Sequence, residues 1–189
     1  MTDIQDATYF SLRLLSDNQY PKVEAGMSAF EPSKADDLEK PVKKGTVCAV
    51  RYSLDHAWYR ARVIRSVGKG QFEVEFLDFG NVDTVHWDDM KRLSQSLLQI
   101  DPQSKGAQLA FIKTLKTGNE VGDEAAKNVQ DFALDNTVDA IVVGEERGLL
   151  QVVLFAKGEK NWSKSLNCQL LEKGLAMMKK YDEDDDTLP

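Results

Sequence analysis

Residues 58–81 read WYRARVIRSVGKGQFEVEFLDFGN, and this stretch decides the fold of the central part of the chain. Apolar and polar residues alternate on both sides of Gly68-Lys69-Gly70, which is the pattern of two half-buried antiparallel strands. The two glycines suit the positive φ angles of a tight hairpin, and this explanation is favoured over a phosphate-binding loop. The sequence therefore predicts a β-hairpin with strands at 58–67 and 71–77.

The alternation also assigns faces to the two strands. In the first strand one face carries Tyr59, Ala61 and Val63, and the other carries Trp58, Arg60 and Arg62. In the second strand Phe72, Val74 and Phe76 share the apolar face. Further strands are expected at 46–52 and 82–86, with a short helical turn at 87–93. Together these segments predict a small β-barrel.

The flanking segments have a different texture. Before the barrel we expect a strand at 8–15, a turn at 16–18, a helix at 21–30 and a linker at 31–41. After it we expect a strand at 107–114, a helix at 123–134, strands at 138–143 and 149–155, and a helix at 162–179. Neither flank suffices for a domain, so the sequence predicts one α+β domain interrupted by the barrel. The expected division is 1–40, 41–95 (barrel), 96–180 and an acidic disordered tail at 181–189.

Composition limits the class of function. The 189 residues are 42% hydrophobic and 29% charged, as in a globular protein, and no stretch has the pattern of a membrane helix or a signal peptide. We therefore expect an intracellular protein whose Cys48 and Cys168 are reduced thiols. The net charge of −7 and the pI of 4.9 disfavour tight binding to a phosphate backbone and suit a cationic peptide.

Two aromatic pairs flank neighbouring strand junctions. Tyr52 and Tyr59 bracket one turn, and Phe76 and Phe79 bracket Leu77-Asp78 in the other. Four ring faces that converge at one end of a barrel would hold a methylated cation by cation–π attraction. On spacing alone, packing of all four rings in the barrel core is the favoured alternative.

Three segments carry a family resemblance: residues 44–52, residues 58–63 and Phe76-Leu77-Asp78-Phe79-Gly80-Asn81. They resemble the extended Tudor domain. The flanks look like the staphylococcal-nuclease-type OB fold into which that Tudor barrel is inserted, and residues 163–176 are similar to its last helix. The chain thus resembles the C-terminal part of Tudor staphylococcal nuclease proteins, and the implied fold is a Tudor SH3-like β-barrel inserted in a split nuclease-like OB domain.

The resemblance also implies a site and a function. Tyr52, Tyr59, Phe76 and Phe79 fall on the family's aromatic cage, Asn81 falls on the asparagine that hydrogen-bonds the bound guanidinium, and Asp78 supports the turn. The implied ligand is symmetric dimethylarginine in Arg-Gly-rich tails of Argonaute/Piwi-like or spliceosomal Sm-like proteins. The implied role is that of a monomeric, non-catalytic adaptor in RNA-silencing or other ribonucleoprotein complexes, in the cytoplasm and alternatively the nucleus. Phe76 and Phe79 replace tyrosines that the family usually has.

Other functions are weighed against this one. A nuclease needs arginines on the phosphate, and Arg13 and Arg147 are the only arginines outside the barrel. The two histidines, His56 and His86, have no metal-ligand spacing to the cysteines, so no metal or cofactor is expected. A methyl-lysine reader remains open because Asp78 could supply a carboxylate. A single-stranded RNA-binding module remains open because basic residues give the barrel a basic side, namely Arg51, Arg60, Arg62, Arg65, Lys69, Lys91 and Arg92.

Overall fold

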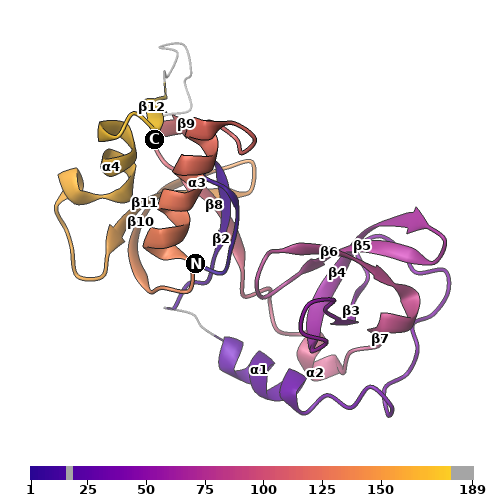
Figure 1. Cartoon of the computed structure of the whole chain (residues 1–189). Helices are drawn as coiled ribbons and strands as arrows, with labels where there is room; N and C mark the ends of the chain where they lie inside the picture. The colour runs from indigo at the N-terminus through magenta and orange to yellow at the C-terminus, as the bar shows by residue number, and fades with distance from the viewer. Residues whose placement is uncertain (16–18, 180–189) are drawn as a thin grey trace. The chain divides into compact units, whose positions relative to one another are not determined.

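The computed structural model of the chain describes residues 1–15 and 19–179 (Figure 1). Contacts divide these residues into two compact units. The barrel unit comprises Thr2 and Ser11–Lys105, and the outer unit comprises Met1, Asp3–Phe10 and residues 106–179. One unit is interrupted in sequence by the other, which confirms the predicted insertion and the α+β class. The predicted turn at 16–18 and the predicted acidic tail lie outside the described residues.

The barrel unit is built on a five-stranded antiparallel sheet with the order β6-β5-β4-β3-β7. The β4–β5 hairpin turns at Gly68-Lys69-Gly70, where all three residues have positive φ angles, as the glycines predicted. The predicted helical turn at 87–93 is only one 3₁₀ turn, after which the chain pairs with β3. The elements of this unit are α1 (Tyr20–Ser28), β3 (Val47–Arg51), β4 (Trp58–Gly68), β5 (Gln71–Phe76), β6 (Val82–His86), η1 (Trp87–Asp89), β7 (Met90–Lys91) and α2 (Gln95–Leu98).

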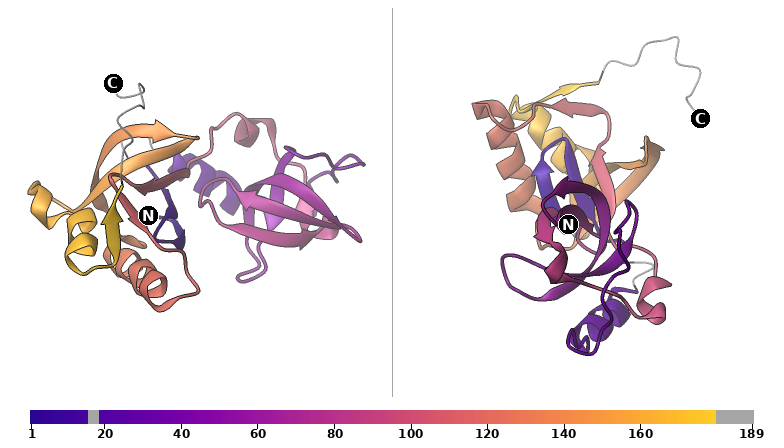
Figure 2. Two further views of the ribbon diagram at one scale, coloured as in Figure 1. Left: turned by 90° about the horizontal axis from the view of Figure 1, so that it is seen from above. Right: turned by 90° about the vertical axis from the view of Figure 1, so that its right-hand side faces the viewer.

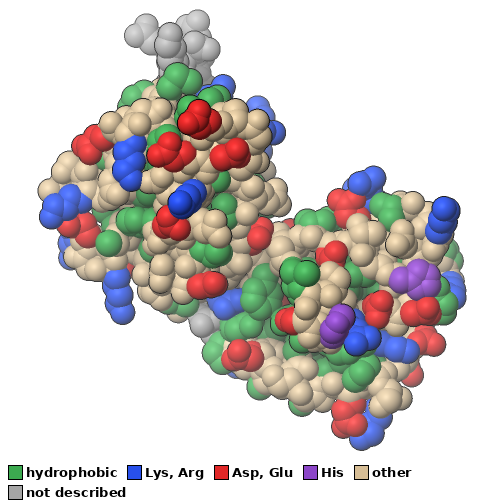
Figure 3. Space-filling model, in the orientation of Figure 1, with side chains coloured by type: hydrophobic (Ala, Val, Ile, Leu, Met, Phe, Trp, Pro, Cys, Tyr) green, Lys and Arg blue, Asp and Glu red, His purple; other side chains and the backbone are tan. Residues whose placement is uncertain are grey.

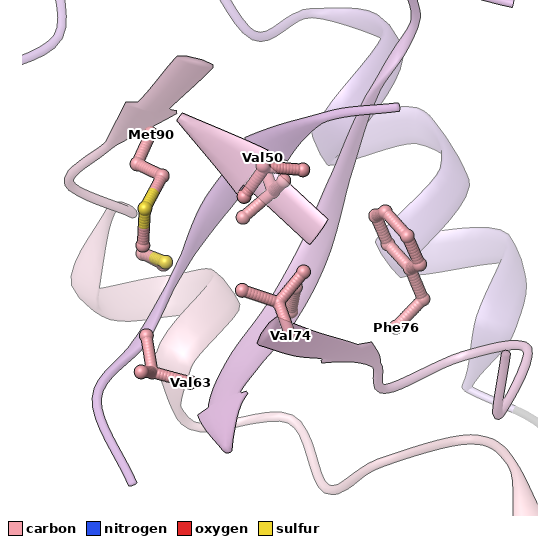
Figure 4. Close-up of a cluster of buried hydrophobic side chains, with 8 residues drawn as sticks. Val50, Val63, Val74, Phe76 and Met90 are labelled. Carbon is pink, nitrogen blue, oxygen red and sulfur yellow. The ribbon is translucent and has the colours of Figure 1, made fainter. Parts of the chain in front are cut away.

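The barrel core follows from the alternation in the strands. Alternate residues in the central parts of β3, β4 and β5 are buried in one cluster, which Figure 4 shows. Burial raises the pKa of the Cys48 thiol to about 12, so this free cysteine is an inert part of the core. The cluster consists of Cys48, Val50, Ala61, Val63, Val74, Phe76, Val85 and Met90.

Helix α1 belongs to the barrel unit. Val23 on this helix is buried, the Phe30 ring that follows it lies 5.4 Å from the Trp58 ring, and Gly26 lies against Leu97 so closely that a Cβ would stand 2.7 Å from a Leu97 methyl. The expected division grouped residues 1–40 with the outer domain. The contacts group this helix with the barrel instead, because its apolar face packs on β4 and α2.

The outer unit contains a five-stranded sheet with the order β1-β2-β8-β11-β10, and a second sheet that pairs β9 with β12. β8 and β11 are parallel, whereas β10 and β11 form an antiparallel hairpin. α3 packs against β1 and α4 against β11 (Figures 1 and 2). The elements are β1 (Asp3–Asp6), β2 (Tyr9–Leu12), which continues into the barrel unit, β8 (Lys105–Leu109), β9 (Ile112–Thr114), α3 (Glu120–Ala133), β10 (Val138–Glu146), β11 (Leu149–Ala156), η2 (Trp162–Lys164), α4 (Leu166–Glu172) and β12 (Ala176–Met178).

Two predictions for this unit were wrong. The predicted helix at 162–179 is a 3₁₀ turn followed by α4, which ends at Glu172 because Gly174, at φ 71°, closes it. The amide of Gly174 donates to Leu171 O and that of Leu175 to Leu170 O, which is the Schellman motif. The chain then forms β12. The predicted strand at 107–114 is likewise two strands, β8 and β9, separated by Phe111 at φ 66°.

One buried ion pair positions the loops of the barrel. The Arg60 side chain is fully buried, and its guanidinium donates to both Asp78 carboxylate oxygens, at 3.0 Å from Nε and 2.6 Å from Nη2. Its remaining N–H groups donate to the carbonyls of Leu97, Ile100 and Asp101 at 2.6–3.1 Å. All five guanidinium donors are therefore satisfied. The sequence placed Arg60 on the solvent face, which was wrong because this face of β4 is covered by the segment that leaves α2.

We expect Arg60→Ala to lower the free energy of unfolding of the barrel unit by about 3–5 kcal/mol, because it leaves Asp78 buried without its partner. Arg62→Ala is the matched control on the same strand. Its ion pair with Glu75 is exposed and 3.8 Å long, so the expected change is within about 1 kcal/mol. Urea unfolding followed by Trp58 fluorescence measures both, and equal effects of the two substitutions would contradict this view of Arg60.

Candidate functional site

The four predicted aromatic residues lie together at one end of the barrel. Tyr59 stands on β4 opposite Val50, and Tyr52 directly follows β3. Phe76 ends β5, and Phe79 lies in the loop to β6. The Tyr52 ring centroid is 6.2 Å from that of Tyr59 and 5.0 Å from that of Phe76, while the Tyr59 centroid is 6.0 Å from Phe76 and 5.4 Å from Phe79. Strand pairing thus brings both aromatic pairs into one cluster.

The four rings differ in exposure. Tyr52, Tyr59 and Phe79 are half-buried, whereas Phe76 is 1% exposed and belongs to the barrel core. The neighbouring rings stand nearly perpendicular, at 71–84°. Such edge-to-face arrangements are the preferred packing of aromatic pairs. The core alternative therefore describes Phe76, whereas the other three rings are partly exposed.

Asn81 closes the loop that carries Phe79. The Phe76 amide donates to the Asn81 carbonyl at 2.9 Å, and the Gly80 amide donates to the Phe76 carbonyl at 2.7 Å. Gly80 has φ 92°, and a Cβ at this position would stand 2.0 Å from Ser11 Oγ, so only glycine fits the turn. Asn81 itself is half-buried, and no hydrogen bond of its side-chain amide is found within residues 1–15 and 19–179. This amide is available to a ligand.

Asp78 lies behind the rings and not among them. The residue is 2% exposed, and its carboxylate accepts from Arg60 and from the Gln103 amide. It braces the turn between Phe76 and Phe79 through these bonds. The methyl-lysine alternative needed this carboxylate beside the ligand, and the pairing with Arg60 removes that support.

A different carboxylate, which the sequence analysis missed, lies beside the ring cluster. The Tyr59 hydroxyl donates to Asp55 Oδ2 at 2.7 Å, and the same side chain accepts from the Ala57 amide. The hydrogen bond to Asp55, together with burial, raises the pKa of Tyr59 from 10.0 to about 12. Asp55 therefore fixes the orientation of the Tyr59 ring and places a negative charge near the rings. A pattern of Asp and Tyr four residues apart in a turn was the only signal for it.

A fifth ring, Tyr20 of α1, stands against the outer side of Phe79. Its centroid lies 5.8 Å from that of Phe79 at 89°, and the Arg13 guanidinium carbon lies 3.4 Å from the Tyr20 centroid. Arg13 also donates to the Asp78 carbonyl at 2.7 Å. No sequence signal links these residues to the β5–β6 loop, because the contacts are made by side chains far apart in the chain. Together they support Phe79 from behind.

Among the described residues no group of three or more His, Cys, Asp or Glu side chains is arranged to hold a metal ion. Nor does the part of the chain that the structure describes contain a helix of the length and apolarity needed to span a membrane. The ring faces, the free amide of Asn81 and the Asp55 carboxylate suit a flat cation with N–H donors.

Comparison with solved structures shows the same fold. The extended Tudor domain of Drosophila melanogaster Tudor-SN superposes with a TM-score of 0.80, at 21% identity over 96% of this chain and 85% of that one. Domain TD3 of mouse TDRD1, solved with a MILI peptide containing dimethylarginine 45, gives a TM-score of 0.81, at 20% identity over 95% of this chain and 91% of that one. The fold of the chain is thus that of the extended Tudor domains.

Sequence comparison gives the family. The Tudor domain model matches residues 1–110, and the chain belongs to the Tudor domain family. Staphylococcal nuclease domain-containing protein 1 of Schizosaccharomyces pombe is 24% identical over 93% of this chain and 20% of its own length. RING finger protein 17 of Homo sapiens is 29% identical over 68% of this chain and 8% of its own length. The chain therefore spans a fifth or less of these relatives.

We expect the Tyr59 phenol to keep its proton well above the pH at which an ordinary tyrosine ionises. Because its folded-state pKa is raised, its contribution to stability is fully present below about pH 10 and is lost as the pH rises through about 12. In Asp55→Asn the pKa of Tyr59 should fall towards 10.0, since the charged acceptor is gone. NMR of chains labelled at tyrosine Cζ measures this value.

Asp83→Asn is the control for that titration. Asp83 accepts a hydrogen bond from Ser53, which lies in the same loop as Asp55. The Tyr59 hydroxyl donates to Asp55 and not to Asp83. The pKa of Tyr59 should stay near 12 in this variant. An unchanged Tyr59 titration in Asp55→Asn would show that Asp55 does not hold the ring.

Proposed function

We propose that this chain is a non-catalytic reader of arginine-methylated peptides, and that it prefers symmetric dimethylarginine. The observation that carries the proposal is the cluster of Tyr52, Tyr59 and Phe79 over the Phe76 floor, with the free amide of Asn81 beside it. The rings would sandwich the flat guanidinium, and the amide oxygen of Asn81 would accept one of its remaining N–H donors.

Methylation favours such a slot for a physical reason. It leaves the guanidinium charge in place, weakens its hydration and blocks some donors. A ring slot gains from the modified form, whereas a carboxylate fork that needs two parallel N–H donors would lose. Phe76 and Phe79 provide the same faces as tyrosines without their hydroxyls, so cation–π attraction is retained.

The solved relatives support the choice of ligand. Extended Tudor domains of similar fold were solved with a symmetrically dimethylated peptide, in human TDRD1, and with a Piwi N-terminal R10me2s peptide, in Drosophila melanogaster Papi. The D287A variant of Papi was also solved with the unmethylated R10 peptide. In our proposal methylation therefore makes the binding selective and is not a requirement for binding itself. We further propose an adaptor role in RNA-silencing or related ribonucleoprotein complexes of the cytoplasm, with Piwi-like or Sm-like tails as partners.

The structure supports the RNA-binding alternative less than the sequence does. Arg60 is buried, and most of the other basic residues of the barrel face carboxylates. On the face drawn in Figure 3, acidic and basic side chains are interspersed without an extended basic surface. The pairs are Arg51–Asp89, Arg62–Glu75, Arg65–Glu73, Lys91–Asp37 and Arg92–Glu39.

We expect an Arg-Gly peptide with one symmetric dimethylarginine to bind more tightly than its asymmetric and unmodified forms. Tyr59→Ala should weaken binding about tenfold or more, because ring contacts with a cation contribute about 0.5–2 kcal/mol each. Isothermal titration calorimetry measures the affinities, and circular dichroism verifies that the variant is folded.

Trp87→Leu is the control for loss of an aromatic residue. Trp87 lies on η1, and its ring is covered by the Lys40 ammonium at 3.4 Å, outside the cage. Its loss should leave peptide affinity unchanged. Equal affinity for all three peptides would refute the proposed reader, and tight binding of a single-stranded RNA that is unaffected by Tyr59→Ala would favour the RNA alternative.

A further inference from the structure

A recess lies beside the cage within the barrel unit, between α1 and β4. Its volume is about 590 Å³, and none of the roles above uses it. Its walls are of mixed polarity, and among the lining residues Met27, Phe30 and Trp58 are only half-buried, so each presents apolar surface to the recess. Apolar surface left open on a folded unit is a candidate for binding, since covering it is favourable.

Packing contacts of α1 fix the helix beside the recess. Gly26 lies against Leu97 of α2, and Val23 is buried, so the helix is fixed to the barrel along one line. The Phe30 ring meets the Trp58 ring at 5.4 Å and 49°. These contacts, together with the packing of α1 on β4, fix the position of the helix beside the recess.

Charge in the recess is balanced except at its rim. Arg60 and Asp78 line the recess, but they satisfy each other in the buried pair. Glu24, exposed on α1, is the one carboxylate at the opening that has no ion pair among the described residues. The interior therefore suits an apolar side chain, while the rim suits a peptide with positive charge.

The recess adjoins the ring cluster, because Tyr59 and Phe79 belong to that cluster and also line the recess. In an extended peptide, side chains two residues apart point to the same side and lie about 7 Å apart. We infer that the recess receives a bulky apolar side chain, such as Leu, Met or Phe, two positions before or after the methylated arginine in the same peptide. This inference rests on the proposed function and adds a sequence preference to it.

The test uses a single-arginine peptide with symmetric dimethylarginine in which the residue at −2 or +2 is Gly, Leu or Asp. We expect one of the two Leu peptides to bind about five- to tenfold more tightly than its Gly form, since a largely buried Leu side chain contributes on this scale. The Asp form should bind no better than the Gly form. Calorimetry gives the affinities, and the NMR signal of the Trp58 indole should shift further with Leu than with Gly.

Ser28→Tyr fills the recess, because Ser28 lines it and is exposed at the end of α1. This variant should lose the preference for Leu and keep its affinity for the Gly peptide. Ala25→Tyr is the matched control, since Ala25 is exposed on the same helix and does not line the recess.

The outcomes separate the two proposals. Equal binding of Gly and Leu peptides at both positions, or a Leu preference that survives Ser28→Tyr, overturns the role inferred for the recess. Either result leaves the proposed methylarginine reader intact. Failure of every methylated peptide to bind the wild-type chain overturns the proposed function and the recess with it.

Discussion

The buried ion pair between Arg60 and Asp78 is the constraint on which the geometry of the barrel unit depends. Removing two charges from water is costly, and the cost is offset only when every donor and acceptor is satisfied. Here the guanidinium joins β4 to the β5–β6 turn and to the backbone beyond α2. A shift of any one of these segments would leave a buried charge without its partner.

This ion pair also fixes the backbone positions of two rings of the cluster. Phe79 follows Asp78 directly, and Tyr59 precedes Arg60, so each of these two rings is adjacent in sequence to a member of the pair. Further contacts act on the rings themselves, since Asp55 holds the Tyr59 hydroxyl and Tyr20 stands against Phe79.

Solved structures at about 20% identity share this architecture, so the fold tolerates wide changes in sequence. Phe76 and Phe79 take part in the packing of this chain with their rings alone, without a hydroxyl. The ring packs either in the core or against its neighbours, and a hydroxyl is needed only where a partner such as Asp55 exists.

The sequence by itself determined the barrel strands, the hairpin at Gly68-Lys69-Gly70, the insertion into an α+β unit and the clustering of Tyr52, Tyr59, Phe76 and Phe79. These features depend on period-two alternation and on the glycine and turn residues, which are local properties of the chain. The end of α4 also depends on a local signal, Lys173-Gly174, although the apolar spacing beyond it suits a helix and a strand alike.

Only the tertiary structure decided which side chains are buried and what they meet. Arg60 belongs by alternation to the solvent face, yet the segment after α2 covers it, and no local pattern records that cover. The burial of Phe76, the support of Phe79 by Tyr20 and Arg13, and the recess under α1 have the same origin. They arise where segments distant in the chain pack together, and the free energy of such contacts depends on geometry that a single stretch of sequence does not contain.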